Sequence, residues 1–135
     1  MWRALGLAAV LAIQGCGDRS APPAPPVRDP ARDFALQMKN LDRQVENLQA
    51  DFAEQKPESV LRDRLARIRE AAVAASGIEY RTVAAENRDL KYQFGLFLDS
   101  LGRLEKSGWR GEEGPRNWKL LTDSCMVCHS IYRVD

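Results

Sequence analysis

Four apolar stripes, each with alternating spacings of four and three residues, constrain the fold of this chain more than any other feature. The first stripe comprises Phe34, Met38, Leu41, Val45, Leu48 and Phe52. This spacing places all its members on one face of an α-helix. Asp29 and Pro30 supply an N-cap and a first-turn proline, and Lys56–Pro57 stops the pattern. We therefore predict a helix that begins at Pro30 and ends before Pro57.

Three further stripes follow along the chain. The second comprises Leu61, Leu65, Ile68, Ala72 and Ala75, the third comprises Leu90, Phe94, Phe97, Leu101 and Leu104, and the fourth comprises Trp118, Leu121, Cys125, Cys128 and Tyr132. Gly77 is expected to end the second helix in a left-handed conformation. The third helix is expected from about residue 78 to residue 106, followed by a loop over residues 107–115.

No segment shows the period-two alternation of a β-strand, so the fold class is all-α. Four amphipathic helices with short connections predict an antiparallel four-helix bundle over residues 30–135. Gly95 and Gly102 interrupt the third helix pattern. They leave two interpretations open: the close approach of a neighbour or flat ligand, or tolerated glycines on a solvent-facing surface.

The N-terminal region has the pattern of an export signal. Residues 1–15 combine Arg3 with an apolar run that is too short for a typical membrane-spanning helix. The run ends in "IQGC", which resembles a bacterial lipobox in which Cys16 becomes lipidated, although Gln14 departs from the usual small residue. An ordinary secretory signal and an uncleaved anchor are alternatives. The proline-rich residues 16–29 predict a stiff tether, so we expect a periplasmic domain held at a membrane by its lipid.

The segment "CMVCH", residues 125–129, is the attachment signature of c-type haem. On a helix, Cys125 and Cys128 share a face and can both form thioethers at one edge of a porphyrin, while His129 binds the iron. A structural zinc site would need a fourth ligand. A thioredoxin-like pair would need a βαβ setting, and a disulfide would leave His129 unexplained.

The sixth iron ligand is the open question in this interpretation. His129 is the only histidine, which excludes two histidine ligands from one chain. Met1 leaves with the signal and Met126 points away from the metal, so Met38 is the candidate thioether. A methionine in an apolar stripe is also ordinary core, and that alternative stays open for Met38.

The stretch "CMVCHSIYR", residues 125–133, resembles the C-terminal motif of the cytochrome c′ family, including its six-coordinate relatives of the cytochrome c-556 type. The resemblance implies an antiparallel four-helix bundle with haem c on the last helix, Cys125 and Cys128 as thioether sites and His129 as proximal ligand. It also implies that Arg133 is a basic residue near the proximal histidine; a solvated cation favoured by the helix dipole is the alternative. "ALQMKNL", residues 35–41, is similar to the segment that carries the methionine ligand in the six-coordinate relatives, which assigns that role to Met38.

These patterns predict electron transfer with a redox partner protein. The alternative is a five-coordinate haem that binds nitric oxide or carbon monoxide, with Phe34, Leu41 or Phe52 walling its distal side. A helical interaction protein with a purely structural haem is a third reading. The net charge of +1 and the absence of a basic stripe argue against nucleic acid as a partner. Without a second histidine or a distal acid or base identifiable in the sequence, we do not expect an enzyme. The oligomeric state is open, with a homodimer as one option.

Overall fold

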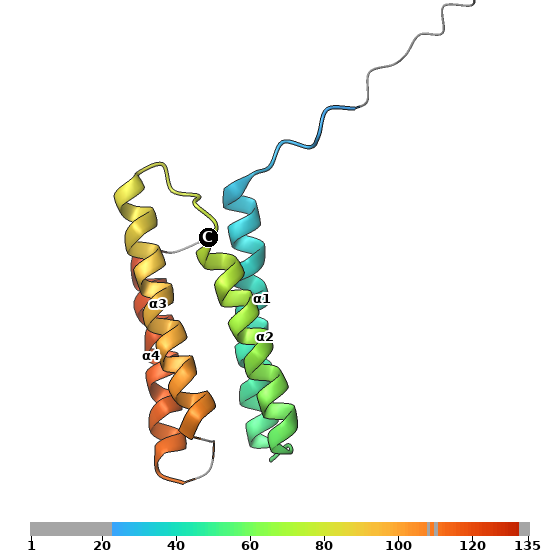
Figure 1. Ribbon diagram of the computed structural model, residues 1–135, viewed down its shortest axis with the longest axis vertical. Coiled ribbons are helices and arrows are strands. Elements are labelled where there is room, and N and C mark those ends of the chain that lie inside the picture. Colours follow the sequence, from blue (N-terminus) through green and yellow to red (C-terminus); the bar gives the residue numbers. More distant parts are fainter. Residues whose placement is uncertain (1–22, 108, 110, 133–135) are drawn as a thin grey trace, which may run out of the picture.

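The computed structural model describes residues 23–107, Trp109 and residues 111–132. This part of the chain contains four helices and no strand: α1 (Pro30–Ala53), α2 (Glu58–Ser76), α3 (Ala84–Ser107) and α4 (Glu113–Ile131). The chain reverses direction at each connection, so consecutive helices are antiparallel (Figure 1). The all-α prediction is confirmed, and the arrangement is consistent with a four-helix bundle. None of the described helices is both long enough and apolar enough to cross a membrane.

Helix α1 begins where the sequence predicts. The Asp29 carboxylate accepts hydrogen bonds from the backbone N–H groups of Ala31 (3.1 Å) and Arg32 (3.3 Å), and Pro30 is the first helical residue. The helix ends at Ala53, because Gln55 takes a left-handed φ of 54° and breaks the helical path before Pro57.

The connection between α2 and α3 differs from the prediction at two points. Gly77 does cap α2, but its φ of −83° is right-handed, so the expected left-handed stop is wrong. Helix α3 begins at Ala84 rather than near residue 78. The Arg81 backbone N–H donates to Asn87 Oδ1, and Asn87 Nδ2 donates to the Arg81 carbonyl, both at 2.9 Å. These bonds satisfy the Arg81 backbone without a helix, which delays the start of α3.

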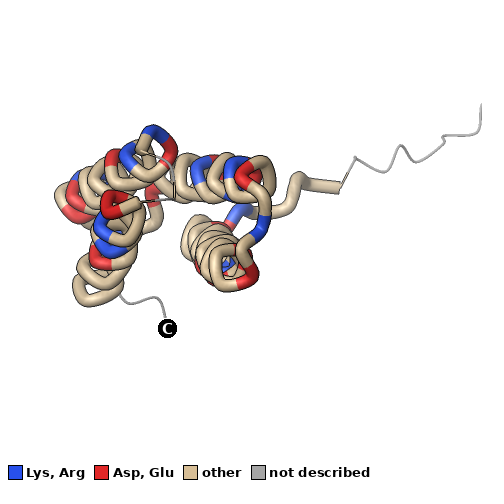
Figure 2. The backbone as a smooth tube through the Cα atoms, turned by 90° about the horizontal axis from the view of Figure 1, so that it is seen from below, with Lys and Arg blue, Asp and Glu red and all other residues tan. Residues whose placement is uncertain are grey.

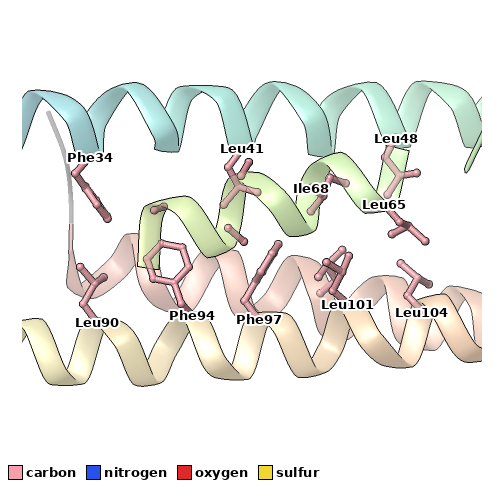
Figure 3. Packing of buried hydrophobic residues seen from close by; sticks show 14 of the residues in the cluster. Phe34, Leu41, Leu48, Leu65, Ile68, Leu90, Phe94, Phe97, Leu101 and Leu104 are labelled. Carbon is pink, nitrogen blue, oxygen red and sulfur yellow. The ribbon is translucent and has the colours of Figure 1, made fainter. Parts of the chain in front are cut away.

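The predicted stripes meet in one hydrophobic core (Figure 3). The residues that point toward one another in the figure are Phe34, Leu41 and Leu48 from α1, Leu65 and Ile68 from α2, and Leu90, Phe94, Phe97, Leu101 and Leu104 from α3. Helix α4 adds Leu121, and its C-cap residue Tyr132 is also buried, whereas Trp118, Cys125 and Cys128 are half-buried. The inward face of α4 is therefore less completely covered than that of α3.

The two interrupting glycines do not mark a tight helix contact. A Cβ added at Gly95 would meet nothing within 4 Å, and one at Gly102 would meet the guanidinium of Arg69 at 3.6 Å. The solvent-facing interpretation therefore applies to Gly95, and Gly102 lies beside a flexible side chain.

Charged residues of both signs are interspersed along the outside of the helices (Figure 2). Among the described residues, two ion pairs join helices that pack on each other. Arg64 Nε donates to Asp51 Oδ2 at 3.0 Å between α1 and α2, and Arg69 lies 2.6 Å from Glu105 between α2 and α3. These pairs stabilise two of the three packed interfaces.

The fourth interface of the bundle is open. Helix α1 packs on α2, α2 on α3, and α3 on α4, but in the described residues no Cα atom of α1 lies within 8 Å of one in α4. We call the space between these two helices the α1–α4 seam. It is lined by Phe34, Met38 and Asp42 of α1 and by Cys125, Cys128 and His129 of α4.

Candidate functional site

Helix α4 carries the "CMVCH" segment over one turn. Cys125 and Cys128 are half-buried and pack against the core, whereas the side chains between them, Met126 and Val127, are 69% and 48% exposed. Both cysteines are free thiols. The prediction that the two cysteines share the inward face of a helix is confirmed.

The two thiols lie in an environment that disfavours their ionisation. Burial, followed by the negative charge of Asp42, raises the pKa of Cys125 to about 11. Burial, followed by the charge of Asp89, also raises the pKa of Cys128. Both side chains are therefore neutral thiols at physiological pH, rather than a reactive thiolate next to a basic partner.

The α1–α4 seam contains two adjoining cavities. The larger has a volume of about 540 Å³ and is lined by Phe34, Ala35, Met38, Lys39, Asp42, Met126, Cys128, His129, Ser130 and Tyr132. The second also has Met38, Asp42, Cys128 and His129 in its lining and adds Cys125, Leu41, Phe94 and Phe97. The larger volume lies within the range of roughly 300–1,000 Å³ that is typical of cofactor pockets.

Met38 lies on the wall opposite His129. Both residues line both cavities, although they belong to the first and the last helix. Met38 is half-buried and packs against the core rather than lying inside it. The structure thus brings the candidate thioether and the candidate proximal histidine to the same space.

Asp42 follows Met38 by one helical turn and faces the same space. Its Oδ1 atom lies 3.9 Å from His129 Nε2, and about half of each side chain is exposed. The sequence analysis missed this residue. Its signal was the spacing of four from Met38, which places a carboxylate beside the apolar stripe of α1.

Tyr132 fastens the end of α4 to α3. Its side chain is buried, and its hydroxyl donates a hydrogen bond to the Asp89 carboxylate. That hydrogen bond, followed by burial, raises the pKa of Tyr132 to about 12. We expected Tyr132 to be a packing residue, and the structure shows that it also makes a polar contact. Arg133 and Cys16 lie outside the described residues, as do residues 1–15.

Tyr80 is a second residue that sequence analysis missed. Its ring stacks on Phe34 with centroids 4.2 Å apart, which places it next to the larger cavity. Its hydroxyl is buried and has no hydrogen-bond partner in the described part of the chain. Burial raises the pKa of Tyr80, so the group stays a neutral donor. Tyr80 itself lines neither cavity, so it contributes to the site through its contact with Phe34.

Phe52, the third of the residues named as a possible distal wall, lines neither cavity of the seam. It lies with Trp109 (centroids 4.3 Å apart) and Trp118 (5.8 Å) around a separate cavity of about 270 Å³. The reason is distance along the helix, because fourteen residues separate Phe52 from Met38 and span about 21 Å. Phe34 and Leu41 do line the cavities of the seam.

The donors in the seam fit a haem better than a bare metal ion. No group of three or more His, Cys, Asp or Glu residues in the described segments is arranged to hold a metal ion. A haem brings four nitrogen donors of its own and asks the chain for a histidine, thioether sites at its edge and apolar walls. His129, the two cysteines, and the pair Phe34 and Met38 offer these groups around one space.

Comparison with known proteins gives no relative for this chain: no family model, no curated protein and no solved structure matches it.

Proposed function

We propose that this protein is an exported c-type cytochrome of the cytochrome c′ type that transfers electrons through one haem c on α4. The observation that carries the proposal is the position of the open interface. The helix face that bears the C-x-x-C-H segment borders the seam between α1 and α4, which is the unpacked side of the bundle. A flat apolar cofactor in that seam supplies the contacts that the fourth interface lacks.

Each residue of the seam has a distinct role in this proposal. Cys125 and Cys128 would hold the haem through thioethers, and His129 would bind its iron. Met38 offers its sulfur from α1, and Phe34 keeps water from the distal side. Haem supplies the one-electron redox chemistry, and histidine–methionine ligation raises its potential. The resemblance adds Arg133 as a basic residue near His129.

The N-terminal region supports a membrane location for this electron carrier. Residues 23–29 are exposed and non-helical, in keeping with a tether that continues from a lipidated Cys16. We propose that the lipid holds the domain at a bacterial membrane on the periplasmic side, close to a redox partner. Mass spectrometry of the mature N-terminus tests this part, and an unmodified Cys16 or its loss would end it.

Binding of nitric oxide or carbon monoxide is the second candidate function. It is favoured by the apolar wall that Phe34 and Ala35 form in the larger cavity. In this alternative Met38 packs beside the haem without binding it, and the free iron position takes a small neutral ligand. Both functions use the haem, and they differ in whether Met38 binds the iron.

The test of the proposal is covalent haem attachment. The full chain, produced in a periplasm with haem c maturation, should gain the mass of one haem and give a haem c pyridine spectrum. The matched control, Cys125→Ala/Cys128→Ala, should have no covalent haem. A wild-type chain without haem, made beside a maturing control cytochrome, would overturn the proposal.

A further inference from the structure

Asp42 lies at the junction of the two cavities in the α1–α4 seam. It lines both of them, together with Met38, Cys128 and His129. Its carboxylate oxygen is 3.9 Å from His129 Nε2, and its side chain is 52% exposed. The charge of Asp42 also contributes, after burial, to the raised pKa of Cys125 on the opposite helix. The field of this carboxylate therefore reaches the face of α4 that would carry the haem.

Iron binding removes the partner that Asp42 has in the described structure. A histidine that binds a metal through Nε2 no longer offers that nitrogen to a carboxylate. An iron held by His129 would occupy the space that Asp42 borders, because the carboxylate oxygen lies 3.9 Å from His129 Nε2. The negative charge of Asp42 would then act on the iron, from the same helix as Met38.

We infer that Asp42 determines the charge selectivity of this site. Its carboxylate favours the oxidised iron, which carries more positive charge, and it weakens the binding of anionic ligands. The binding of neutral ligands changes little. This inference rests on the proposed haem site. The physical basis is the Coulomb interaction at short range in a partly water-excluded space. Lys39 also lines the larger cavity and carries the opposite charge to Asp42.

The first test is the reduction potential of the holoprotein. Asp42→Asn should raise the ratio of reduced to oxidised protein at a fixed ambient potential about tenfold, which corresponds to about 59 mV for one electron. Asp42→Glu keeps the charge and should stay within about twofold of wild type. The matched control is Asp99→Asn, since Asp99 is an exposed aspartate on α3 that lines neither cavity.

The second test compares an anionic ligand with a neutral one. Equilibrium binding of azide to the oxidised protein should tighten about tenfold in Asp42→Asn, whereas imidazole binding should change less than about twofold. The difference should shrink as ionic strength rises, because the carboxylate is half exposed and open to screening.

The outcomes separate the two proposals. A chain without covalent haem overturns the function and this inference together. A haem-loaded Asp42→Asn protein that behaves like Asp99→Asn overturns the inference alone. If the Asp42→Asn protein does not accumulate with haem, the reduction potential of Asp42→Ser is compared with that of Asp42→Glu. Equal reduction potentials of these two variants overturn the inference.

Discussion

Met38 is the residue on which the choice between electron transfer and gas binding depends. It belongs to the apolar stripe of α1, yet it is only half-buried and borders both cavities of the seam. A core methionine and an iron ligand have the same sequence signature, because both occupy the inward face of a helix. The location in the seam leaves its sulfur available to a group bound there.

Replacing Met38 by leucine should convert the oxidised holoprotein from low-spin to high-spin. Leucine nearly conserves the volume, so stability should fall by less than about 1.5 kcal/mol while the thioether is lost. The absorption spectrum reports the change through loss of the far-red thioether-to-iron band. Met126→Leu is the control: Met126 also borders the larger cavity, but it is 69% exposed and lies on the same helix as His129, so its replacement should keep the band. A wild-type protein that is already high-spin would favour gas binding instead.

At the scale of the helices, regular segments were predictable and their junctions less so. The stripe from Leu90 to Leu104 is buried throughout, because apolar periodicity alone selects the inward face of α3. The start of that helix was misplaced by about six residues. The Asn87 side chain hydrogen-bonds to the backbone of Arg81 and replaces the hydrogen bonds that a helix would make there. Such a side-chain contact leaves no trace in the apolar periodicity of the sequence.

The Tyr132–Asp89 contact is a junction whose pH dependence can be measured. The pKa of Tyr132 is raised to about 12, above its ordinary value of 10.0. The protonated phenol is the form that the fold favours. The contribution of this hydrogen bond to the stability of the fold is therefore complete below pH 10 and is lost as the pH rises through 12.

We expect the melting temperature of wild type to fall between pH 10 and pH 12 by more than that of Tyr132→Phe, which has no phenol to ionise. Thermal melts followed by circular dichroism at each pH provide the measurement. Tyr92→Phe is the matched control, since Tyr92 is a 63% exposed tyrosine on α3. Parallel pH profiles for wild type and Tyr132→Phe would contradict the assignment.

At the scale of the whole molecule, the main feature is that the described helices form three packed interfaces and leave one seam open. The apolar walls of the seam, including Phe34, Leu41 and Phe97, border its cavities. Covering each 100 Å² of such surface stabilises the fold by about 2.5 kcal/mol. A haem in the seam should therefore act as part of the core.

The wild-type chain made without haem maturation should melt at least about 10 °C below the haem-loaded chain, given the usual relation between free energy and melting temperature for a domain of this size. Hydrogen exchange should accelerate most in the first half of α1 and the second half of α4, and least where α2 packs on α3. Equal melting temperatures for the two forms would contradict a cofactor in the seam.

The sequence by itself determined the four helices and their inward faces, because apolar periodicity is a local property. The C-x-x-C-H spacing is local as well, and it predicts haem chemistry at residues 125–129. Only the tertiary structure decided which interface stays open and which residues share it. A helix pattern states which face turns inward but not which neighbour it meets. How the helices pack decided that Met38 and Asp42 meet His129 and that Phe52 lies at a separate cavity. It also left the Tyr80 hydroxyl without a hydrogen-bond partner among the described residues.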